Sequence, residues 1–319
     1  MRILVTGATG FVGTWLLAHL DEAYQDGSAE LFGTEHGQPL GPVPSSVRLV
    51  SCDLTNAGAA KTVIGDLRPD RVFHLAGFAS ATGTDHALIH RVNVEASVSL
   101  LQALDDLARP CRVQLASSGY VYGATVPGRP AREDDAPAPS GAYAESKAAM
   151  EQAARAFARP GGALSITVTR SFNHSGPRQS PGFFVPAVAR QIARIEAGLE
   201  PPVVRVGNLD AKRDFLDVRD VVRAYQLLLE AEPAGDNFRV VNVASGEARV
   251  IQSLLDALVA LSHVPLSVET DPARVRPLDL PECTGDSSLL QTLTGWQSAV
   301  PLNQTLADTL DYWREHAGD

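Results

Sequence analysis

A glycine-rich turn close to the start of the chain places the strongest constraint on the fold. Residues 1–6 are apolar and β-branched and predict a short strand, and the apolar spacing of residues 15–20 predicts an amphipathic helix. Gly7-Ala-Thr-Gly10-Phe-Val-Gly13 lies between them. In such a unit the first glycine allows a tight turn, the second lets the backbone approach a pyrophosphate, and the third allows close helix packing. We therefore predict dinucleotide contacts from Gly7, Gly10, Phe11, Val12 and Gly13.

Four further apolar segments indicate that this unit begins a parallel sheet. The predicted strands cover residues 29–34, 47–51, 71–75 and 112–116. Alternation of strands with helices is typical of a parallel sheet with right-handed crossovers. The predicted fold is α/β, a Rossmann-type doubly wound parallel sheet with a smaller C-terminal α/β lobe for the substrate. In such sheets the ligand crevice lies at the carboxyl ends of the strands.

The end of the second predicted strand bears on the choice of cofactor. Glu35 follows this strand directly. A carboxylate there can accept hydrogen bonds from the adenosine ribose hydroxyls and would repel a 2′-phosphate, so Glu35 favours NAD(H). A solvated loop glutamate is the alternative. His36 is a candidate for a weak phosphate contact, which leaves NADP(H) open.

The ends of the third and fourth predicted strands extend the cofactor site. Asp53 is placed to meet the adenine edge, and the small residues Ala76 and Gly77 let a ligand lie against the backbone. The predicted contacts at these two ends are Asp53, Leu54, Leu75, Ala76 and Gly77.

An acid–base pair is predicted in the helical segment 141–157. Tyr143 and Lys147 stand four residues apart, so a helix places them one turn apart on the same face, about 5–6 Å between Cβ atoms. A lysine ammonium beside a phenol stabilises the phenolate, so we expect the Tyr143 pKa to fall from about 10 toward the range of an acid–base catalyst. Chance packing of two helix residues is the alternative for the pair taken alone. Ser118 ends the fifth predicted strand, at the expected crevice.

The composition argues against several other classes of protein. The net charge is −10, the pI is near 5.3, and the basic residues are scattered singly, which argues against nucleic acid or an anionic membrane as a partner. Cys52, Cys111 and Cys283 lack Cys-x-x-Cys spacing, and the eight histidines lack paired helical spacing, so we expect no disulfide and no metal site. The chain shows no basic leader followed by an apolar run, and no run of 18 apolar residues. We therefore expect a cytoplasmic protein.

In their order and spacing, the motifs resemble those of the extended short-chain dehydrogenase/reductases that act on nucleotide sugars, the NAD-dependent epimerase/dehydratase family. They are the glycine turn, Asp53-Leu54, His74-Leu-Ala-Gly77, Asn93, Ser118 and Tyr143-x-x-x-Lys147, and the resemblance covers essentially the whole chain. It implies that Tyr143 is the acid–base, that Lys147 binds the nicotinamide ribose and tunes the tyrosine, and that Ser118 hydrogen-bonds the reacting sugar oxygen. It also adds Asn93, Tyr143 and Lys147 to the cofactor contacts.

The later chain narrows the resemblance to members that act on GDP-linked sugars. Residues 170–177, 182–185, 190–195, 206–220, 271–277, 285–286 and 294–296 are similar to the GDP-mannose 4,6-dehydratases and, more closely, to the GDP-6-deoxy-D-mannose reductases. The resemblance implies that Asn173, Arg213 and Arg276 hold the nucleotide diphosphate. The forked donors of a guanidinium suit phosphate oxygens, and a protein with a net negative charge needs such local positive groups to bind a diphosphate. Val185 and Arg190 are further expected substrate contacts, and a surface ion-pair role is the alternative for each arginine.

One departure from the resemblance separates two chemistries. The 4,6-dehydratases carry a carboxylate just after the Ser/Thr of this strand, which takes the C5 proton and helps to expel water. Here Gly119 and Tyr120 follow Ser118, so this carboxylate is missing. Reduction needs only a hydride and one proton, and the sequence therefore favours a reductase over a dehydratase. Tyr120 is expected either to shape the sugar pocket or to pack.

The expected activity is NAD(P)H-dependent reduction of the C4 keto group of a nucleotide-linked 4-keto-6-deoxyhexose. The expected reaction converts GDP-4-keto-6-deoxy-D-mannose to GDP-D-rhamnose. One alternative is a nucleotide-sugar 4-epimerase with retained NAD, and another is a dTDP-4-keto-6-deoxyhexose 4-ketoreductase. A non-enzymatic nicotinamide-sensing protein on the same fold is disfavoured, because Ser118, Tyr143 and Lys147 are all present.

The segments also predict a domain division. Residues 1–170 form the dinucleotide domain, and 214–243 return to it as a helix and a strand. Residues 171–213 and 244–319 form the lobe that closes over the nucleotide sugar. By resemblance alone, the helix after Asn93 and the Tyr143 helix pair between subunits, so we expect a homodimer.

Overall fold

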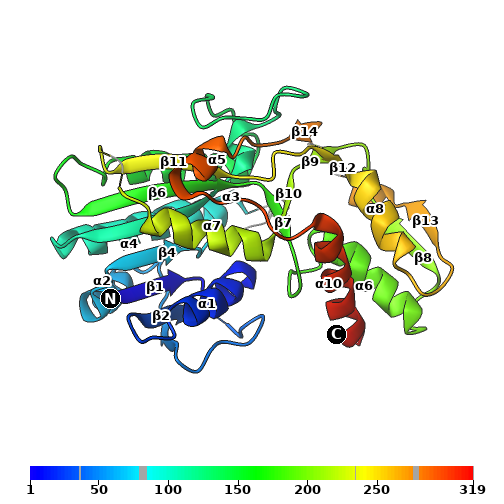
Figure 1. The fold of residues 1–319 in the computed structure, drawn as a ribbon, viewed down its shortest axis with the longest axis horizontal. Helices are drawn as coiled ribbons and strands as arrows, with labels where there is room; N and C mark the ends of the chain where they lie inside the picture. The colour runs from blue at the N-terminus through cyan, green and yellow to red at the C-terminus, as the bar shows by residue number, and fades with distance from the viewer. Residues whose placement is uncertain (36, 79–84, 234, 276–279, 319) are drawn as a thin grey trace.

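The larger part of the molecule is a seven-stranded, wholly parallel sheet (Figure 1). The computed structural model describes residues 1–35, 37–78, 85–233, 235–275 and 280–318. In spatial order the strands are β11 (Phe238–Val243), β6 (Leu164–Ser171), β5 (Cys111–Ser118), β4 (Arg71–His74), β1 (Arg2–Thr6), β2 (Glu30–Glu35) and β3 (Arg48–Ser51). The strand order reverses beside β1, which makes a Rossmann-type doubly wound sheet and confirms the predicted fold class.

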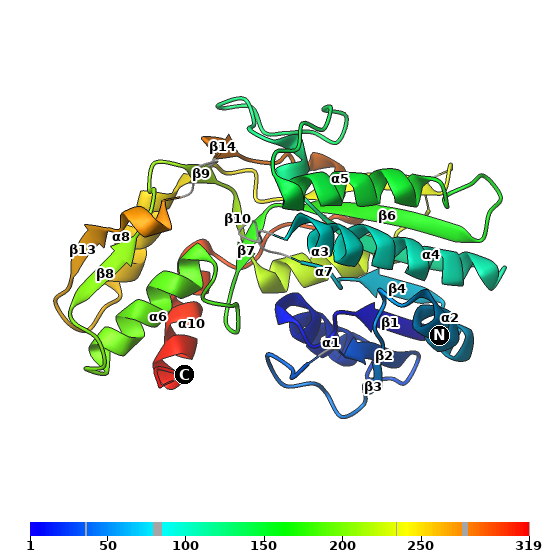
Figure 2. The ribbon, with the colours of Figure 1, turned by 180° about the vertical axis from the view of Figure 1, so that it is seen from behind.

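Helices cover both faces of this sheet. Figure 1 shows α1 (Phe11–Ala23) and α7 (Val218–Glu230) on the near face, and α9 (Ser288–Thr294) packs on the same side through Leu290. Figure 2 shows α2 (Ala57–Leu67), α3 (His86–His90), α4 (Ala96–Asp106) and α5 (Ala142–Arg155) on the opposite face. The inner strands therefore bury side chains on both of their faces, as parallel strands do, whereas the edge strand β3 is only partly covered.

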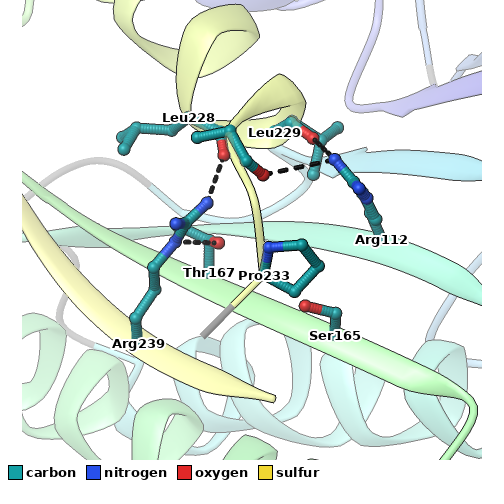
Figure 3. A pocket seen from close by; sticks show the side chains of 8 residues that line it. Arg112, Ser165, Thr167, Leu228, Leu229, Pro233 and Arg239 are labelled. Atoms are coloured by element: carbon teal, nitrogen blue, oxygen red, sulfur yellow. Dashed lines mark hydrogen bonds between the residues drawn. The ribbon is translucent and has the colours of Figure 1, made fainter. Parts of the chain in front are cut away.

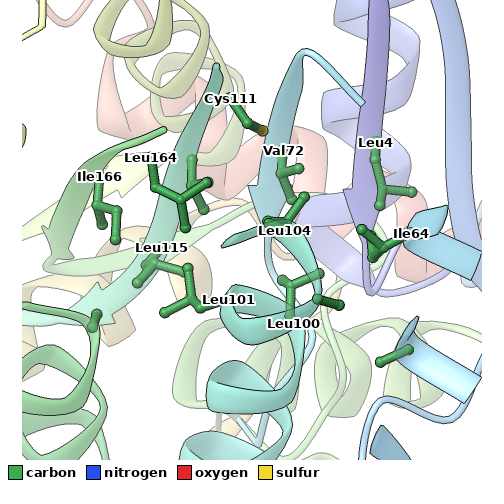
Figure 4. Packing of buried hydrophobic residues seen from close by; sticks show 14 of the residues in the cluster. Leu4, Ile64, Val72, Leu100, Leu101, Leu104, Cys111, Leu115, Leu164 and Ile166 are labelled. Carbon is green, nitrogen blue, oxygen red and sulfur yellow. The ribbon is translucent and has the colours of Figure 1, made fainter. Parts of the chain in front are cut away.

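Alternation along β1 divides the core of the large domain into two layers. Ile3 and Val5 pack under α1 and α7, whereas Leu4 points to the face covered by α2 and α4. In Figure 4 the second layer is built from leucines of α4 that fit against strand residues such as Val72 and Leu115. Full burial of one such side chain stabilises the fold by about 1.5–3 kcal/mol, so this core fixes the positions of the strand ends.

Two arginines secure the far end of α7, away from the carboxyl ends of the strands. Figure 3 shows a shallow depression lined by Arg112 and Arg239. Arg112 donates to the carbonyls of Leu229, Glu230 and Ala231 at 3.3, 3.0 and 3.2 Å. Arg239 donates to the carbonyl of Leu228. Cations at a helix C-terminus satisfy its unpaired carbonyls and complement its dipole, so this feature has a structural explanation.

A smaller lobe extends from one end of the sheet (Figure 1). It contains α6 (Phe184–Glu196), α8 (Ile251–Ala260), α10 (Leu302–Glu315) and the parallel pair β8 (Val203–Val206) and β13 (Ser267–Thr270). The three helices share a core of their own, to which α6 contributes Val185 and Ile192 and α10 contributes Leu310.

Short strands join the two parts. They are the parallel pair β7 (Asn173–Ser175) and β10 (Phe215–Asp217), and the trio β9 (Lys212–Arg213), β12 (Arg249–Val250) and β14 (Glu282–Cys283). Asp214, which is fully buried, accepts hydrogen bonds from the N–H groups of Ser245 (2.8 Å), Gly246 (3.0 Å) and Gly285 (3.3 Å). One carboxylate therefore ties together three segments that are distant in sequence.

Candidate active site

The glycine turn packs closely against the end of β4. Gly7 has a φ of +64°, which favours glycine, and a Cβ on it would come within 2.8 Å of the Ala76 nitrogen. A Cβ on Gly13 would lie 2.2 Å from the Gly7 carbonyl oxygen. Helix α1 begins at Phe11 after Gly10, which has no side chain with which to cap it. The first N–H groups of α1 therefore face the strand ends, in an arrangement that suits a pyrophosphate.

A buried chain of hydrogen bonds connects the end of β1, just before this turn, to β4 and to the helices after β4. Thr6 Oγ1 lies 2.7 Å from His74 Nδ1, and His74 Nε2 lies 2.8 Å from Ser97 Oγ, which itself donates to the Asn93 carbonyl at 2.7 Å. Burial and the Lys147 charge lower the His74 pKa to about 3, so the ring is neutral at ordinary pH. Since the Ser97 hydroxyl proton is already donated, His74 donates from Nε2 and accepts at Nδ1.

Asn93 connects the end of β4 to the acid–base helix α5. It lies in a π-helical turn (Arg91–Glu95) and is fully buried. Its Oδ1 accepts the N–H of Phe78 at 2.8 Å, and its Nδ2 donates to Ser146 Oγ at 2.9 Å. Ser146 Oγ in turn donates to the Tyr143 carbonyl at 2.8 Å. Asn93 therefore helps to set where the Tyr143 turn of α5 sits.

Ser118 and Tyr143 meet at the carboxyl end of β5. Ser118 is almost fully buried, accepts the N–H of Tyr120 at 3.2 Å and lies close enough to the Tyr143 phenol to affect the pKa of that phenol. Burial raises the Tyr143 pKa to about 12, the neighbouring Ser118 hydroxyl lowers it, and the nearby Tyr225 and Tyr120 raise it. The expectation that the Tyr143 pKa falls below its usual value is therefore wrong for the structure, because desolvation of the phenolate is the largest effect on this pKa.

Lys147 lies on the same face of α5, one turn after Tyr143. Its Nζ donates to the Ala116 carbonyl at 2.8 Å and lies 3.4 Å from where a Cβ on Gly77 would stand. Burial lowers the Lys147 pKa to about 8, and Glu151 opposes this shift. The ammonium therefore sits between the ends of β4 and β5, beside the residues expected to contact the cofactor.

The residues expected at the adenosine end lie on the far side of β1. Glu35 is the last residue of β2 and is partly exposed. Asp53 is exposed, and its Oδ1 accepts the N–H and hydroxyl of Thr55 at 2.9 and 2.7 Å, so it also stabilises its own turn. The Leu54 side chain is buried in the core, and His36 lies outside the described residues.

The expected substrate contacts of the lobe are less closely grouped in the structure. Asn173 opens β7 and is partly exposed, and the Arg190 guanidinium lies 5.7 Å from the Trp313 ring centroid. Val185 is only 1% exposed and packs inside the lobe, so only its backbone is available to a ligand. Arg276 lies outside the described residues.

Arg213 links the lobe to the catalytic strand. Its Nη1 donates to the carbonyls of Lys212 and Leu280, both at 2.7 Å, and its Nε lies 3.3 Å from the Tyr120 hydroxyl. Tyr120 follows Ser118 by two residues, so a basic side chain of the lobe reaches the turn that carries the site serine.

Several residues that position the site were not singled out from the sequence. Ser146 and Ser97 hold Asn93, and Tyr225 of α7 hydrogen-bonds Ser171 across 2.7 Å beside the Tyr143 phenol. The polar positions on the otherwise apolar faces of α4 and α7 were the available signal. Polar side chains that are buried must find partners, and here the partners belong to the site.

These residues fit a nicotinamide dinucleotide. The turn leaves no room for a side chain at Gly7, the helix end presents N–H groups, and Lys147 and Tyr143 stand at the strand ends beyond them. Within the described residues, no group of three or more His, Cys, Asp or Glu side chains could hold a metal ion. None of the helices among those residues is long and apolar enough to cross a membrane.

Comparisons with known proteins agree with this geometry. The model of the NAD dependent epimerase/dehydratase family matches residues 3–244. The chain is 35% identical to a GDP-6-deoxy-D-mannose reductase of Pseudomonas aeruginosa over 98% of its own length and 97% of the relative's. The structure of RMD from P. aeruginosa complexed with NADPH is 32% identical, covers 99% of both chains and has a TM-score of 0.82. A UDP-glucose 4-epimerase of Thermus thermophilus in complex with NAD is 28% identical, with a TM-score of 0.84 and coverage of 98% and 99%.

Proposed function

The chain belongs to the NAD dependent epimerase/dehydratase family, and from this premise we propose that it reduces the C4 keto group of a nucleotide-linked 4-keto-6-deoxyhexose with NAD(P)H. The proposed substrate is GDP-4-keto-6-deoxy-D-mannose and the proposed product is GDP-D-rhamnose. The P. aeruginosa relative, named as a reductase of a GDP-6-deoxyhexose and similar over almost its whole length, supports this choice of sugar.

One observation carries the choice of reduction over dehydration. A Cβ on Gly119 would come within 2.7 Å of the Phe172 ring, so no acidic side chain fits there without a rearrangement. The next residue is Tyr120, whose hydroxyl lies beside Arg213. Beside Ser118 and Tyr143 there is thus no carboxylate at the place where a dehydratase would need its second acid–base group.

In the proposed reaction, bound NAD(P)H supplies the hydride that adds to C4 of the sugar. Ser118 donates a hydrogen bond to the C4 oxygen and polarises the carbonyl. Tyr143, held next to Ser118, transfers its phenolic proton to that oxygen as negative charge develops on it. A Tyr143 pKa raised to about 12 fits the role of a proton donor that stays protonated until the substrate takes its proton.

Lys147 has two parts in this scheme. Its ammonium, which donates to the Ala116 carbonyl, would hold the nicotinamide ribose. The same charge favours the Tyr143 phenolate that remains after proton transfer, and so lowers the barrier to that step.

The proposed division of labour assigns the nucleotide sugar to the smaller lobe. We propose that residues 1–170 and 214–243 bind the cofactor, and that 171–213 and 244–319 close over the substrate. Asn173 and Arg213 would hold the diphosphate, and Arg190 and Arg276 are proposed as further contacts. GDP is proposed as the nucleotide because the resemblance of the later segments is to GDP-sugar enzymes.

Two further proposals concern the protein in the cell. A homodimer through α4 and α5 is proposed from the family resemblance, and light scattering during gel filtration would test it by giving the mass of one or two chains. The proposed reaction draws on the cytoplasmic NAD(P)H pool, so we propose that the protein acts in the cytoplasm.

A nicotinamide absorbance assay tests the proposed function. Purified protein would be incubated with NADH or NADPH and enzymatically generated GDP-4-keto-6-deoxymannose, beside the dTDP-4-keto-6-deoxyglucose analogue. Stoichiometric oxidation with the GDP sugar only is expected, and NMR of the product would give the configuration at C4. Oxidation with the dTDP sugar alone would move the proposal to that substrate class. Protein that carries bound NAD, oxidises neither cofactor and interconverts UDP- or GDP-hexoses would be an epimerase.

A further inference from the structure

A buried glutamate follows Lys147 by one turn on the catalytic helix. Glu151 lies on the face of α5 that packs on the sheet and is only 7% exposed. A carboxylate is rarely buried to this extent unless its charge is paired and its oxygens are hydrogen-bonded. Its partners therefore indicate why the fold places it beside the site.

Glu151 is bound from two adjacent strands. Arg170 of β6, 5% exposed, donates from Nε to both carboxylate oxygens at 3.1 and 3.2 Å and from Nη2 to Oε2 at 2.7 Å. Ser117 of β5 donates its hydroxyl to Oε1. Ser117 and Arg170 are direct neighbours in the β5–β6 ladder. One carboxylate therefore fastens α5 to both strands at the same level of the sheet.

The Ser117–Arg170 pair lies one residue before the reacting groups along the two strands. The next pair in the ladder is Ser118 and Ser171. Ser118 lies next to the Tyr143 phenol, and Ser171 hydrogen-bonds the Tyr225 hydroxyl. We call Glu151 with its partners Arg170 and Ser117 the clamp. The clamp sets the distance between the helix that carries Tyr143 and Lys147 and the strand that carries Ser118.

The charges around Lys147 give Glu151 a second role. His74 of β4 faces the ammonium and is neutral, because burial and the Lys147 charge depress its pKa to about 3. Tyr143 on the same helix is protonated at neutral pH. Arg170 of β6 is cationic and is neutralised by its paired contact with Glu151. Of these groups, Glu151 alone is an anion, and its charge opposes the fall in the Lys147 pKa that burial causes.

We propose that Glu151 is a positioning residue for the reaction, which holds α5 at its working distance from Ser118 and keeps the Lys147 side chain in its cationic form. This inference rests on the catalytic role proposed for Lys147. The clamp acts through Lys147 and Ser117 and has no contact of its own with the reacting atoms in the proposal.

Direct titration of Lys147 tests the proposal without any substrate. The chain has three lysines, Lys61, Lys147 and Lys212, so protein labelled with ¹³C at lysine Cε gives three signals, and Lys147→Met identifies one of them. The wild-type signal of Lys147 is expected to titrate with a pKa of about 8. In Glu151→Gln the loss of the anion leaves Arg170 unneutralised, so this pKa should fall by about 1 unit or more.

Two variants separate the charge of Glu151 from its packing. In Arg170→Gln the Glu151 anion has only Lys147 as a cationic neighbour among the groups named above, so the Lys147 pKa should rise. Glu196→Gln removes a comparable buried carboxylate, which Arg314 holds at 2.8 and 2.9 Å in the lobe, and should leave Lys147 unchanged. An unchanged Lys147 pKa in Glu151→Gln, or a fall in both Glu151→Gln and Arg170→Gln, would overturn the proposal.

A kinetic profile then connects the clamp to turnover. In Glu151→Gln the alkaline limb of kcat should move to lower pH together with the Lys147 titration, and Glu151→Asp should restore part of the shift. If Glu151→Gln does not fold in thermal melts, Ser117→Ala, which weakens one arm of the clamp and keeps both charges, should lower kcat and leave the Lys147 pKa within a few tenths of a unit. A wild-type protein without reductase activity would remove the proposed function but leave the titration result standing.

Discussion

The two halves of the candidate site are built in different ways. On the dinucleotide side, Thr6 and His74 end neighbouring strands, and buried hydrogen bonds join them through Ser97 to Asn93 inside one domain. Ser118 ends β5 of the same sheet. On the lobe side, the expected contacts come from β7, α6, β9 and a segment beyond residue 275. Of these contacts, Arg213 is linked to the catalytic strand through Tyr120, which follows Ser118 by two residues.

This difference suggests a division between chemistry and recognition. Groups that exchange a proton or hold the nicotinamide need fixed positions, and the close-packed sheet provides them. The groups proposed to recognise the nucleotide sugar lie on short strands and a separate helical core, where local changes leave the sheet untouched. Family members could therefore share the acid–base set and differ in sugar and nucleotide.

The largest effect is expected from a substitution on the dinucleotide side of the site. Tyr143→Phe removes the proton donor and should lower kcat by about 10³-fold or more, whereas the dissociation constants for NADH and NADPH should stay within about twofold. Steady-state turnover and cofactor fluorescence titration would measure both. Turnover within tenfold of the wild type would refute the acid–base role.

Substitutions in the glycine turn test whether the close packing on the dinucleotide side tolerates an added side chain. Gly13→Ala puts a Cβ 2.2 Å from the Gly7 oxygen, so the free energy of unfolding should fall by about 1–3 kcal/mol and cofactor binding should weaken. Gly65→Ala is the matched control: Gly65 lies in α2, and nothing stands within 4 Å of its Cβ position. Urea unfolding should show this control to be about 0.5–1 kcal/mol more stable than the wild type. Normal cofactor affinity and stability in Gly13→Ala would contradict the tight-turn account.

On the lobe side, Arg213→Lys keeps the charge but loses the forked donors. The KM for the nucleotide sugar should rise about tenfold, or about 1.4 kcal/mol, and the cofactor dissociation constant should not change. Arg249 pairs with Arg213 in the β9–β12 ladder but is exposed, so Arg249→Lys should change the KM by less than about twofold. Equal effects in the two variants would show that the role of Arg213 is general electrostatics.

The junction between the halves should respond to pH through Asp214. Burial raises the Asp214 pKa to about 6, against an ordinary value of 3.8, and its hydrogen bonds with Ser245, Gly285 and Gly246 limit the rise. The stability that follows from a raised carboxyl pKa is fully present below about pH 4 and is lost as the pH rises through 6. Asp214→Asn should therefore be more destabilising at pH 4.5 than at pH 7.5, by about 1–3 kcal/mol in urea unfolding. The same penalty at both pH values would show that the carboxyl does not titrate in this range.

The smallest effect is expected at the adenosine end. Glu35→Gln removes the charge that would repel a 2′-phosphate, so the ratio of the dissociation constants for NADPH and NADH should fall about threefold to tenfold, or roughly 1 kcal/mol. Glu30→Gln, at the exposed start of the same strand, should leave the ratio unchanged. Fluorescence titration with each cofactor gives the ratios. No change in Glu35→Gln would remove this residue from cofactor selection.

The sequence predicted the sheet well because its signals are local. The strand predicted within 214–243 corresponds to β11, and the five strands predicted between residues 1 and 116 differ from the observed strands by at most two residues at their ends. The glycine turn and the spacing of Tyr143 and Lys147 need no long-range information, since a tight turn and one helical turn fix the geometry.

The remaining features depend on tertiary packing. Desolvation of Tyr143 reverses the expected direction of its pKa shift, and the burial of Val185 depends on which face of α6 meets α8 and α10. The partners of Glu151 come from strands 34 and 19 residues away, a pairing that no local pattern encodes. Such contacts appear only when the chain is folded.

Deuteride transfer tests the central claim most directly. Nicotinamide cofactor deuterated at the transferable position would be incubated with the protein and GDP-4-keto-6-deoxymannose, and the product would be analysed by NMR and mass spectrometry. The account predicts one deuterium at C4 of the sugar for each cofactor oxidised, and labelling that is slower by about 10³-fold or more with Tyr143→Phe. Unlabelled sugar, or a hexose inverted at C4 with the cofactor unchanged, would contradict it.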